Sequence, residues 1–406
     1  MASGDGPQDA DLSAVPYGGG KTAKAHRRGR RRRRRGPVYA RGLEVAVLTP
    51  VAIPDPPTVA AVAEQGGPFY GALDLGTNNC RLLVATPREH GFRVVDAFSR
   101  IVRLGEGIGA NGRLGEAAMA RAIEALKVCS AKLSERNVGR VRMIATEACR
   151  AAENGEEFIV RVREETGLAI EIVSREAEAR LAVAGCASLV DTQAAGVILF
   201  DIGGGSSELV WIDLAPAADG RKRRMADRIR TWMSLPVGVV NVSERHGGKH
   251  ITPVQFAAMV DEVAAMVASF PQGAELDAAV KLGGVHMLGT SGTVTTLAGI
   301  HLELPRYDRR KVDGVWLTGE RVAGLIEELV AMDYDQRIAN PCIGRERADL
   351  VLAGCAILEA IRRRWPCERL RVADRGLREG VLVEMMAADG VWRSRSGRRS
   401  GERFHG

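Results

Sequence analysis

A regular pattern of apolar and polar positions begins near Phe69 and continues to about residue 388. Three short runs with strand character come first, and segments whose apolar residues recur at helical spacing follow them. The predicted elements are strands at 69–75, 81–87 and 92–104, a helix at 114–133, a strand at 140–146, a helix at 155–166 and a strand at 168–174. An antiparallel start followed by alternating helices and strands predicts an α/β domain with a mixed sheet.

A second unit with a similar arrangement of strands and helices follows. A helix begins near Arg175, and the apolar strand 196–202 opens the unit. We then expect strands at about 207–213 and 226–235, helices near 252–270, 291–300, 318–331 and 345–364, and a last turn and amphipathic helix in ADRGLREGVLVEMM. These elements predict a first lobe over residues 68–181 and a second over 182–388, with the last helix packing back on the core.

One strand-turn-strand sequence occurs in each unit. LDLGTNNCRL aligns with FDIGGGSSEL, which pairs Asp74 with Asp201 and Arg81 with Glu208. Each turn has an acid at the end of a buried strand and small residues after it, so backbone N–H groups can point at a bound phosphate. Ordinary β-hairpins use Gly, Asn and Ser in the same way. The repeated Asp favours the phosphate interpretation, because a buried carboxylate is costly unless a cation or donors compensate it.

A third Gly-rich sequence, MLGTSGTVTTLAG, leads into a predicted helix. Residues 290–293 would lie at the helix N-terminus, where backbone N–H groups bind anions. A Ser or Thr that caps the helix explains the same residues about as well.

Positive charge is concentrated at the two ends of the chain. The formal net charge of the 406 residues is +7, to which residues 1–66 contribute +5 and residues 389–406 contribute +3, so the middle is close to −1. Both ends lack apolar periodicity, which predicts a disordered basic arm (1–66) and a disordered basic tail (389–406). The Arg-rich residues 21–36 would hold RNA or another polyanion, unless the arm is simply a solvated tail.

The seven cysteines form no CxxC pair, so neither a disulfide framework nor a zinc site is indicated. No apolar run reaches the roughly 18 to 20 residues of a membrane span, and no apolar segment of an export signal follows the N-terminal charges. We therefore expect a cytoplasmic protein without membrane contact.

Seven motifs resemble those of one family. In chain order they are ALDLGTNNCRLLVA, ATEACRAAEN, SREAEARLA, FDIGGGSSELV, SLPVGVV, LGTSGTVTTLAG and ADRGLREGVL. Their order and spacing are similar to those of the exopolyphosphatase/guanosine pentaphosphate phosphohydrolase (Ppx/GppA) family over roughly residues 68–388. The resemblance implies a duplicated ribonuclease-H-like, actin-like ATPase (ASKHA) fold with two lobes around a central cleft. It also implies a homodimer and the short form of the family, without the C-terminal HD-like domain.

The resemblance further implies roles for particular residues. Glu178 would activate the attacking water in preference to Glu176, and Asp74 and Asp201 would hold Mg²⁺, with Mn²⁺ as an alternative. The residues implied in phosphate binding are Thr77, Asn78, Asn79, Arg150, Gly203, Gly204, Gly205, Ser206, Ser207, Gly289, Ser291 and Gly292. Glu208 and Arg103 would support the loops without touching phosphate.

Simpler interpretations are open for several of these residues. The negative charge of Glu178 would interact favourably with the dipole of its helix whichever way the side chain points. Arg150 would suit an exposed helix position paired with a nearby Glu. Glu208 fits a surface strand equally well. For Arg375 and Arg378 of the last motif, the favoured interpretation is charge on the surface of a helix, and the alternative is that they approach the cleft.

Taken together, these features predict a Mg²⁺-dependent exopolyphosphatase that releases terminal orthophosphate by water attack. Hydrolysis of guanosine pentaphosphate (pppGpp) to ppGpp would be an additional activity, because both substrates present the same terminal phosphoanhydride. The alternatives are an ATP-dependent kinase of the same fold and a non-catalytic sensor that binds polyphosphate or the alarmone. A water-activating acid at Glu178 favours hydrolysis over both.

Overall fold

The computed structural model describes residues 44–46, 69–216 and 223–392. The predicted arm, apart from residues 44–46, and the predicted tail from residue 393 onward lie outside the described residues. The polyanion-binding segment predicted at 21–36 lies outside them as well. Among the residues that are described, no helix combines the length and the apolar character that crossing a membrane requires.

The first sheet has five strands in the order β4-β3-β2-β5-β6. They are β2 (Tyr70–Leu75), β3 (Asn79–Pro87), β4 (Phe92–Ile101), β5 (Arg140–Ala145) and β6 (Glu171–Ile172). β2, β3 and β4 form an antiparallel meander, whereas β5 runs parallel to β2 and β6 parallel to β5. The apolar β2 and β3 form the buried centre of this sheet, as expected for strands covered on both faces.

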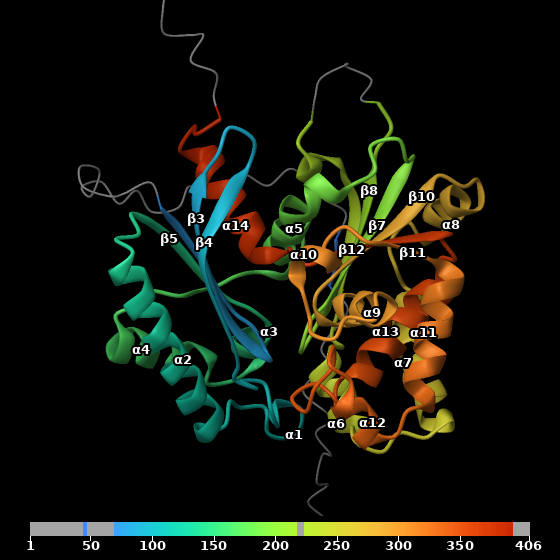
Figure 1. Ribbon diagram of the computed structural model, residues 1–406, viewed down its shortest axis with the longest axis horizontal. Coiled ribbons are helices and arrows are strands. Elements are labelled where there is room, and N and C mark those ends of the chain that lie inside the picture. Colours follow the sequence, from blue (N-terminus) through green and yellow to red (C-terminus); the bar gives the residue numbers. More distant parts are fainter. Residues whose placement is uncertain (1–43, 47–68, 217–222, 393–406) are drawn as a thin grey trace, which may run out of the picture. The chain divides into compact units, whose positions relative to one another are not determined.

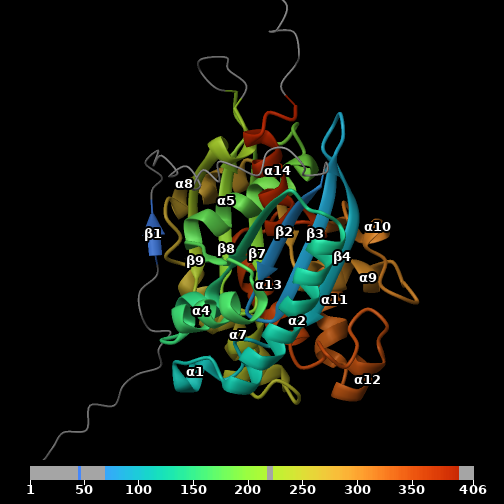
Figure 2. The same cartoon turned by 90° about the vertical axis from the view of Figure 1, so that its left-hand side faces the viewer.

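The second sheet has seven strands in the order β1-β9-β8-β7-β10-β12-β11. They are β1 (Glu44–Ala46), β7 (Gly196–Ile202), β8 (Ser207–Asp213), β9 (Ile229–Leu235), β10 (Val285–Thr290), β11 (Trp316–Thr318) and β12 (Arg369–Ala373). β7, β8 and β9 form an antiparallel meander, and β10 and β12 run parallel to β7. β1 and β11 add an antiparallel strand at each edge (Figure 2).

The two sheets repeat one topology. The order and directions of β2, β3, β4, β5 and β6 recur in β7, β8, β9, β10 and β12. Asp74 lies opposite Arg81 in the first sheet, and Asp201 lies opposite Glu208 in the second. The alignment of the two sequence repeats is therefore confirmed as a structural equivalence. This is the duplicated ribonuclease-H-like fold that the sequence predicted.

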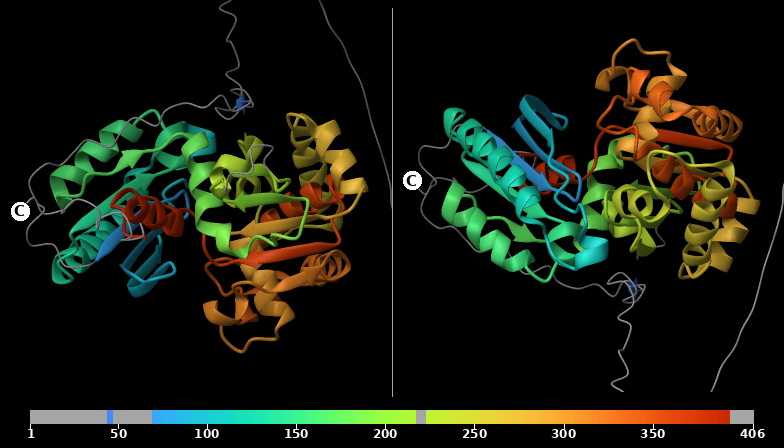
Figure 3. Two further views of the ribbon diagram at one scale, coloured as in Figure 1. Left: turned by 90° about the horizontal axis from the view of Figure 1, so that it is seen from above. Right: turned by 90° about the horizontal axis from the view of Figure 1, so that it is seen from below.

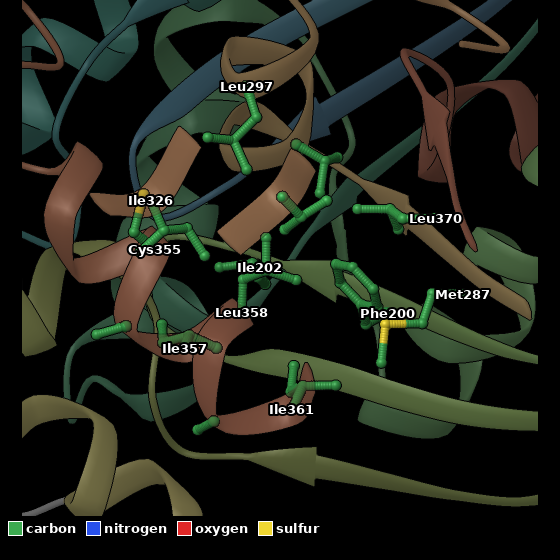
Figure 4. Packing of buried hydrophobic residues seen from close by; sticks show 14 of the residues in the cluster. Phe200, Ile202, Met287, Leu297, Ile326, Cys355, Ile357, Leu358, Ile361 and Leu370 are labelled. Atoms are coloured by element: carbon green, nitrogen blue, oxygen red, sulfur yellow. The ribbon is translucent and has the colours of Figure 1, made fainter. Parts of the chain in front are cut away.

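Helices cover both sheets (Figure 1). The helices of the first unit are α1 (Ile108–Asn111), α2 (Glu116–Glu135), α3 (Glu147–Ala151) and α4 (Gly155–Thr166). Those of the second are α6 (Val239–His246), α7 (Pro253–Val267), α8 (Gly273–Lys281), α9 (Gly292–His301), α10 (Arg309–Val312), α11 (Gly319–Ala331), α12 (Tyr334–Ala339) and α13 (Val351–Arg364). Figure 4 shows the core of the second unit, where Phe200 of β7 and Met287 of β10 lie in one cluster with Leu358 of α13.

Two further helices, α5 (Arg175–Cys186) and α14 (Leu377–Ala388), pack against each other next to the sheets. α14 also contacts β2 of the first sheet, and α5 contacts β8 of the second (Figures 1 and 3). The crossing is close because a Cβ on Gly185 would lie 2.0 Å from the Gly376 carbonyl oxygen, and one on Gly380 would lie 2.0 Å from that of Leu181. Glycine in the last motif thus lets the two helix backbones meet. The domain boundaries given above stay predictions.

Several elements differ from the sequence prediction. Residues 225–228 form a 3₁₀ helix, so β9 begins at Ile229 and not at 226. The helix expected from 345 begins only at Val351. β12 and β10 were not predicted as strands, because RLRVA mixes arginine with apolar residues and VHMLGT reads as a lead into the next helix. Both strands are short and are specified by pairing with β7 and its neighbours, which local sequence does not report.

Candidate active site

A pocket of about 550 Å³ is lined by residues of both sheets. Its walls contain the two repeated turns, the first turns of α5, α9 and α14, and the loops that precede α10 and α13. Equivalent ends of β2 and β7 therefore face one cavity, which is the usual location of ligand sites in α/β folds.

The glycine turn of the second repeat has its carbonyl groups fixed by α6. Two backbone N–H groups in the first turn of α6 donate to the carbonyls of Gly203 and Gly204, both at 2.9 Å. The amide of Asn241 donates to the carbonyl of Gly205 at 2.8 Å. Within the described chain, the N–H groups of Gly204, Gly205 and Ser206 have no acceptor. A turn whose carbonyls are held on one side and whose N–H groups are free can bind phosphate oxygens.

The turn of the first repeat is built in the same way. The carbonyl of Thr77 accepts from Gly105 N–H at 2.9 Å, and that of Asn78 accepts from two N–H groups of residues 102 and 103. The N–H groups of Thr77 and Asn78 find no acceptor among the described residues. The side-chain oxygen Oδ1 of Asn78 is buried without a partner there. This turn therefore also presents polar groups that need a ligand.

The two turns touch each other. A Cβ on Gly204 would lie 2.8 Å from Thr77 Cβ and 3.1 Å from the Asn78 backbone nitrogen. A Cβ on Gly205 would lie 2.8 Å from Thr77 Oγ1 and 3.1 Å from Cγ of Glu147. The glycines of the second repeat thus allow direct contact with the first repeat, and the free N–H groups of both turns lie at one place.

Three carboxylates stand at the strand ends beside these turns. Burial raises the pKa of Asp74 and of Asp201, and Arg81 opposes the effect at Asp74. Ser291 Oγ donates to Asp201 Oδ1 at 2.5 Å and likewise opposes it. Burial and the charge of Asp201 raise the pKa of Glu208 to about 7. The second repeat therefore concentrates negative charge where the first repeat balances an acid with an arginine.

Glu178 lies in the first turn of α5 and lines the same pocket. Ser174 caps this helix by accepting from the N–H of Ala177. The side chain of Glu178 is buried, and burial, followed by the charge of Glu208, raises its pKa well above the usual value. Glu176 is only half-buried and does not line the pocket. A buried carboxyl with a raised pKa in a pocket is a candidate proton acceptor.

Arg150 holds Glu178 in place. Its guanidinium donates to Glu178 Oε2 at 3.0 Å, to Glu147 Oε2 at 2.6 Å and to the carbonyl of Val173 at 2.7 Å. Glu147 is buried and also pairs with Arg175 at 3.1 Å. Arg150 is half-buried and does not line the pocket, and the pairing with a nearby Glu that the sequence allowed is confirmed at Glu147. It holds Glu178 through the 3.0 Å contact, and its predicted role in phosphate binding stays a prediction.

The third Gly-rich sequence reaches the pocket through Ser291 and Gly292. Ser291 precedes α9 with a φ of 75°, and its hydroxyl bonds Asp201 and makes no cap hydrogen bond, so helix capping does not explain this residue. Gly289 lies inside β10, where a Cβ would come 2.5 Å from the ring of Phe200. A glycine at this position therefore allows close packing inside the core, away from the pocket surface.

Three other predicted site residues lie away from the pocket surface or are more buried than expected. Ser207 is buried and donates to the carbonyl of Val237 at 2.7 Å. Glu208 is not on the surface; it is buried and accepts from Ser206 and Ser234 at 2.8 and 2.9 Å. Arg103 lies outside the pocket lining and bonds Asp349 through both terminal nitrogens, at 2.9 and 3.1 Å. Thr77, Asn79 and the remaining predicted residues of the two turns line the pocket.

Sequence reasoning did not assign Arg81 and Arg347 to the pocket, and it gave Arg378 only as an alternative. Arg81, Arg347 and Arg378 line the pocket, and none of them forms an ion pair with a carboxylate of the described residues. Burial lowers the pKa of Arg347 and of Arg378. Arg375 also lines the pocket and is paired with Asp313. For Arg375 and Arg378 the favoured interpretation as surface charges was therefore wrong, and the alternative, an approach to the cleft, is the one found. Half-buried cations without a partner are costly, and a bound polyanion would compensate them.

The residues present fit Mg²⁺ better than a metal held only by protein. Among the described residues, no group of three or more His, Cys, Asp or Glu side chains could hold a metal ion. Asp74 and Asp201 instead offer two carboxylates in the pocket, and Asn78 offers an unpartnered oxygen. Mg²⁺ commonly binds to one or two carboxylates and completes its shell with water and substrate phosphates.

A model of the Ppx/GppA phosphatase family matches residues 83–389. The guanosine-5'-triphosphate,3'-diphosphate pyrophosphatase of Aeromonas salmonicida (strain A449) is 29% identical over 323 residues, which cover 79% of this chain. The chain spans about 60% of the length of this curated relative.

Solved structures show the same fold. The crystal structure of the Aquifex aeolicus member of the Ppx/GppA family has 28% identity and a TM-score of 0.64, and the match covers 79% of this chain and 98% of that one. The exopolyphosphatase of Cytophaga hutchinsonii ATCC 33406 has 24% identity and a TM-score of 0.67, with 79% and 98% covered. The topology, the paired turns and the match over residues 83–389 together show that the chain belongs to the Ppx/GppA phosphatase family.

Proposed function

We propose that the protein is a Mg²⁺-dependent exopolyphosphatase, which removes the terminal orthophosphate from inorganic polyphosphate by attack of water. The observation that carries this proposal is the position of Glu178, a buried carboxyl that lines the same pocket as two turns with free backbone N–H groups. The family membership and the exopolyphosphatase and pyrophosphatase names of its relatives support the substrate class.

Substrate binding would use the free backbone N–H groups of both turns. The terminal phosphate would be held by Gly204, Gly205 and Ser206 on one side and by Thr77 and Asn78 on the other. Arg81, Arg347 and Arg378 would neutralise the following phosphates, since the described chain provides no carboxylate partner for them. Asp74 and Asp201 would hold Mg²⁺, which when bound neutralises charge on the transferred phosphoryl group.

Glu178 would perform the proton transfer. Its carboxylate accepts a proton from a water whose oxygen attacks the terminal phosphorus, while the bond from that phosphorus to the bridging oxygen breaks. The products are orthophosphate and a polyphosphate shorter by one unit, whose new terminal oxygen keeps the bond's electron pair. Arg150 fixes the direction of the carboxylate through the 3.0 Å contact with Glu178 Oε2. The raised pKa of Glu178 makes its carboxylate a stronger base than an exposed one.

Guanosine pentaphosphate would be a second substrate of the same site. Its terminal phosphoanhydride is chemically the same as that of polyphosphate, and the curated relative from Aeromonas salmonicida is named for this nucleotide. The two turns contact only the phosphates in this scheme, so they do not discriminate between the substrates.

Phosphate release from polyphosphate, guanosine pentaphosphate and ATP tests the proposal. We expect Mg²⁺-dependent release from polyphosphate, weaker or comparable release from the pentaphosphate, and loss of both with a chelator. Mn²⁺ should restore part of the activity. Tight binding of polyphosphate without turnover under any metal condition would refute hydrolysis and favour a sensor.

A further inference from the structure

A second cavity, of about 460 Å³, adjoins the pocket. One wall is the end of β4, residues 99–101, and the other is the loop of residues 343–347 between α12 and α13. Asn79, Ser99 and Arg347 line both cavities, so the second one continues the first. We call it the outer groove.

The outer groove is positively charged. Arg100 and Arg345 line it and are exposed, and neither forms an ion pair with a carboxylate of the described residues. Arg347 lies at the junction with the pocket and is also without such a partner. The one carboxylate among the lining residues is that of Glu346. Three guanidinium groups along one path from the pocket therefore have donors available for anions.

The walls of the groove are held in position by hydrogen bonds. Arg103 donates to the Glu346 carbonyl at 3.1 Å and pairs with Asp349, which ties the segment after β4 to the loop before α13. Within that loop, Gly344 N–H donates to the Asn340 carbonyl at 3.0 Å, and Arg347 N–H donates to the Gly344 carbonyl at 3.2 Å. The groove is thus formed before a ligand arrives, which lowers the entropic cost of binding.

We propose that the outer groove binds the downstream phosphates of a linear polyphosphate whose terminal phosphate lies in the pocket. This inference rests on the function proposed above and specifies its preferred substrate as an inorganic chain longer than the pocket holds. A repeating anion fits a series of separate guanidinium groups, because each phosphate can accept hydrogen bonds from one of them. None of the lining residues is aromatic, so the groove offers no stacking surface for a guanine base.

The test compares inorganic triphosphate with long-chain polyphosphate as substrates of the full-length protein. The double variant Arg100→Gln, Arg345→Gln should lower the ratio of kcat/KM on long chains to kcat/KM on triphosphate by about 10-fold, mainly through KM. The ratio should also become less dependent on salt, since two cationic contacts are lost. Arg93→Gln is the matched control, because Arg93 is an exposed residue of the same strand β4 that lies outside both cavities.

The outcomes separate this inference from the proposed function. Wild-type protein that hydrolyses no polyphosphate of any length would refute the function and the groove together. Wild-type hydrolysis with an unchanged ratio in the double variant would refute the groove alone. A double variant that loses activity on guanosine pentaphosphate, with its long-chain ratio intact, would also overturn the inference, since the groove would then serve the nucleotide. If Arg93→Gln lowered the ratio of long-chain to triphosphate kcat/KM as much as the double variant does, the effect would be one of general charge, and the inference about the groove would be overturned as well.

Discussion

Glu178 and Glu208 interact electrostatically within one buried cluster. Burial is the largest cause of the raised pKa of Glu178, and the charge of Glu208 is the next. Glu178 must be deprotonated to accept a proton from water. We therefore expect kcat/KM to rise with pH through the raised pKa of Glu178, which places the acid limb of the profile above the range of an exposed glutamate.

The variant Glu208→Gln tests this coupling. An amide oxygen can still accept from Ser206 and Ser234, whereas the charge that raises the pKa of Glu178 is removed. The acid limb of kcat/KM should move to lower pH in the variant. Circular dichroism checks that the variant is folded. If its acid limb then lies at the same pH as that of the wild type, Glu208 does not influence the ionisation of Glu178.

Thermal unfolding gives a second prediction at this scale. The folded state holds the proton of Glu178 more tightly than the unfolded state, so deprotonation of Glu178 destabilises the fold. This loss of stability grows as pH rises through the raised pKa of Glu178. Glu178→Gln has no carboxyl to deprotonate and therefore does not lose this stability. Its Tm should match that of the wild type at acidic pH and exceed it by about 2 to 4 °C at alkaline pH. A variant that is less stable than the wild type at alkaline pH would contradict the pKa assignment.

The sequence predicted the acids of the site better than its cations. Glu178 could be preferred over Glu176 because the motif resemblance singled it out, and the helix indeed turns Glu178 to the pocket. Arg347 could not be found from sequence, since it lies in a loop. Arg378 was only an alternative, since an arginine in an amphipathic helix is usually a surface charge. Their function depends on which distant elements meet them, and local patterns do not contain that information.

At the scale of elements, the site depends on the contact between the two repeated turns. Gly204→Ala should push the turn of residues 76–79 away, because the new Cβ would meet Thr77 Cβ at 2.8 Å. A displacement of phosphate-binding groups by about 1 Å lowers rates by about 100-fold, so kcat/KM should fall by about that factor.

Gly115→Ala is the control for this change. A Cβ at Gly115 would meet nothing within 4 Å, and its φ of −77° suits alanine. Steady-state kinetics with both variants checks the prediction. Equal activity of Gly204→Ala and Gly115→Ala would mean that contact between the turns does not matter for the reaction.

The elements of the repeat were predictable because each copy carries its own pattern. An apolar strand, an acid, a small-residue turn and a second strand occur in both copies, and both fold alike. β10 and β12 were not predictable, because their burial comes from the parallel strands on either side. α6 was missed for a similar reason: its first turn is fixed by the carbonyls of the glycine turn, which no local signal in its own sequence announces.

At the scale of the whole molecule, charge is divided between the body and the ends. Residues 1–43 contain all eleven Lys and Arg residues of the predicted arm and lie outside the described residues. Removing residues 1–43 keeps β1, which pairs with β9. If the arm captures polyanions, the deletion should weaken binding to RNA and flatten its dependence on salt concentration. Filter binding at several salt concentrations measures this slope, and an unchanged slope would favour a solvated arm.

The central claim is that Glu178 activates water in the pocket formed by the two repeated turns. Glu178→Gln and Glu176→Gln change neighbouring acids in the first turn of α5, of which only Glu178 lines the pocket. The measurement is kcat for phosphate release from polyphosphate with Mg²⁺ present. We predict a loss of about 100- to 10,000-fold for Glu178→Gln, with KM nearly unchanged, and a value near that of the wild type for Glu176→Gln. Turnover by Glu178→Gln at the wild-type rate would contradict the account.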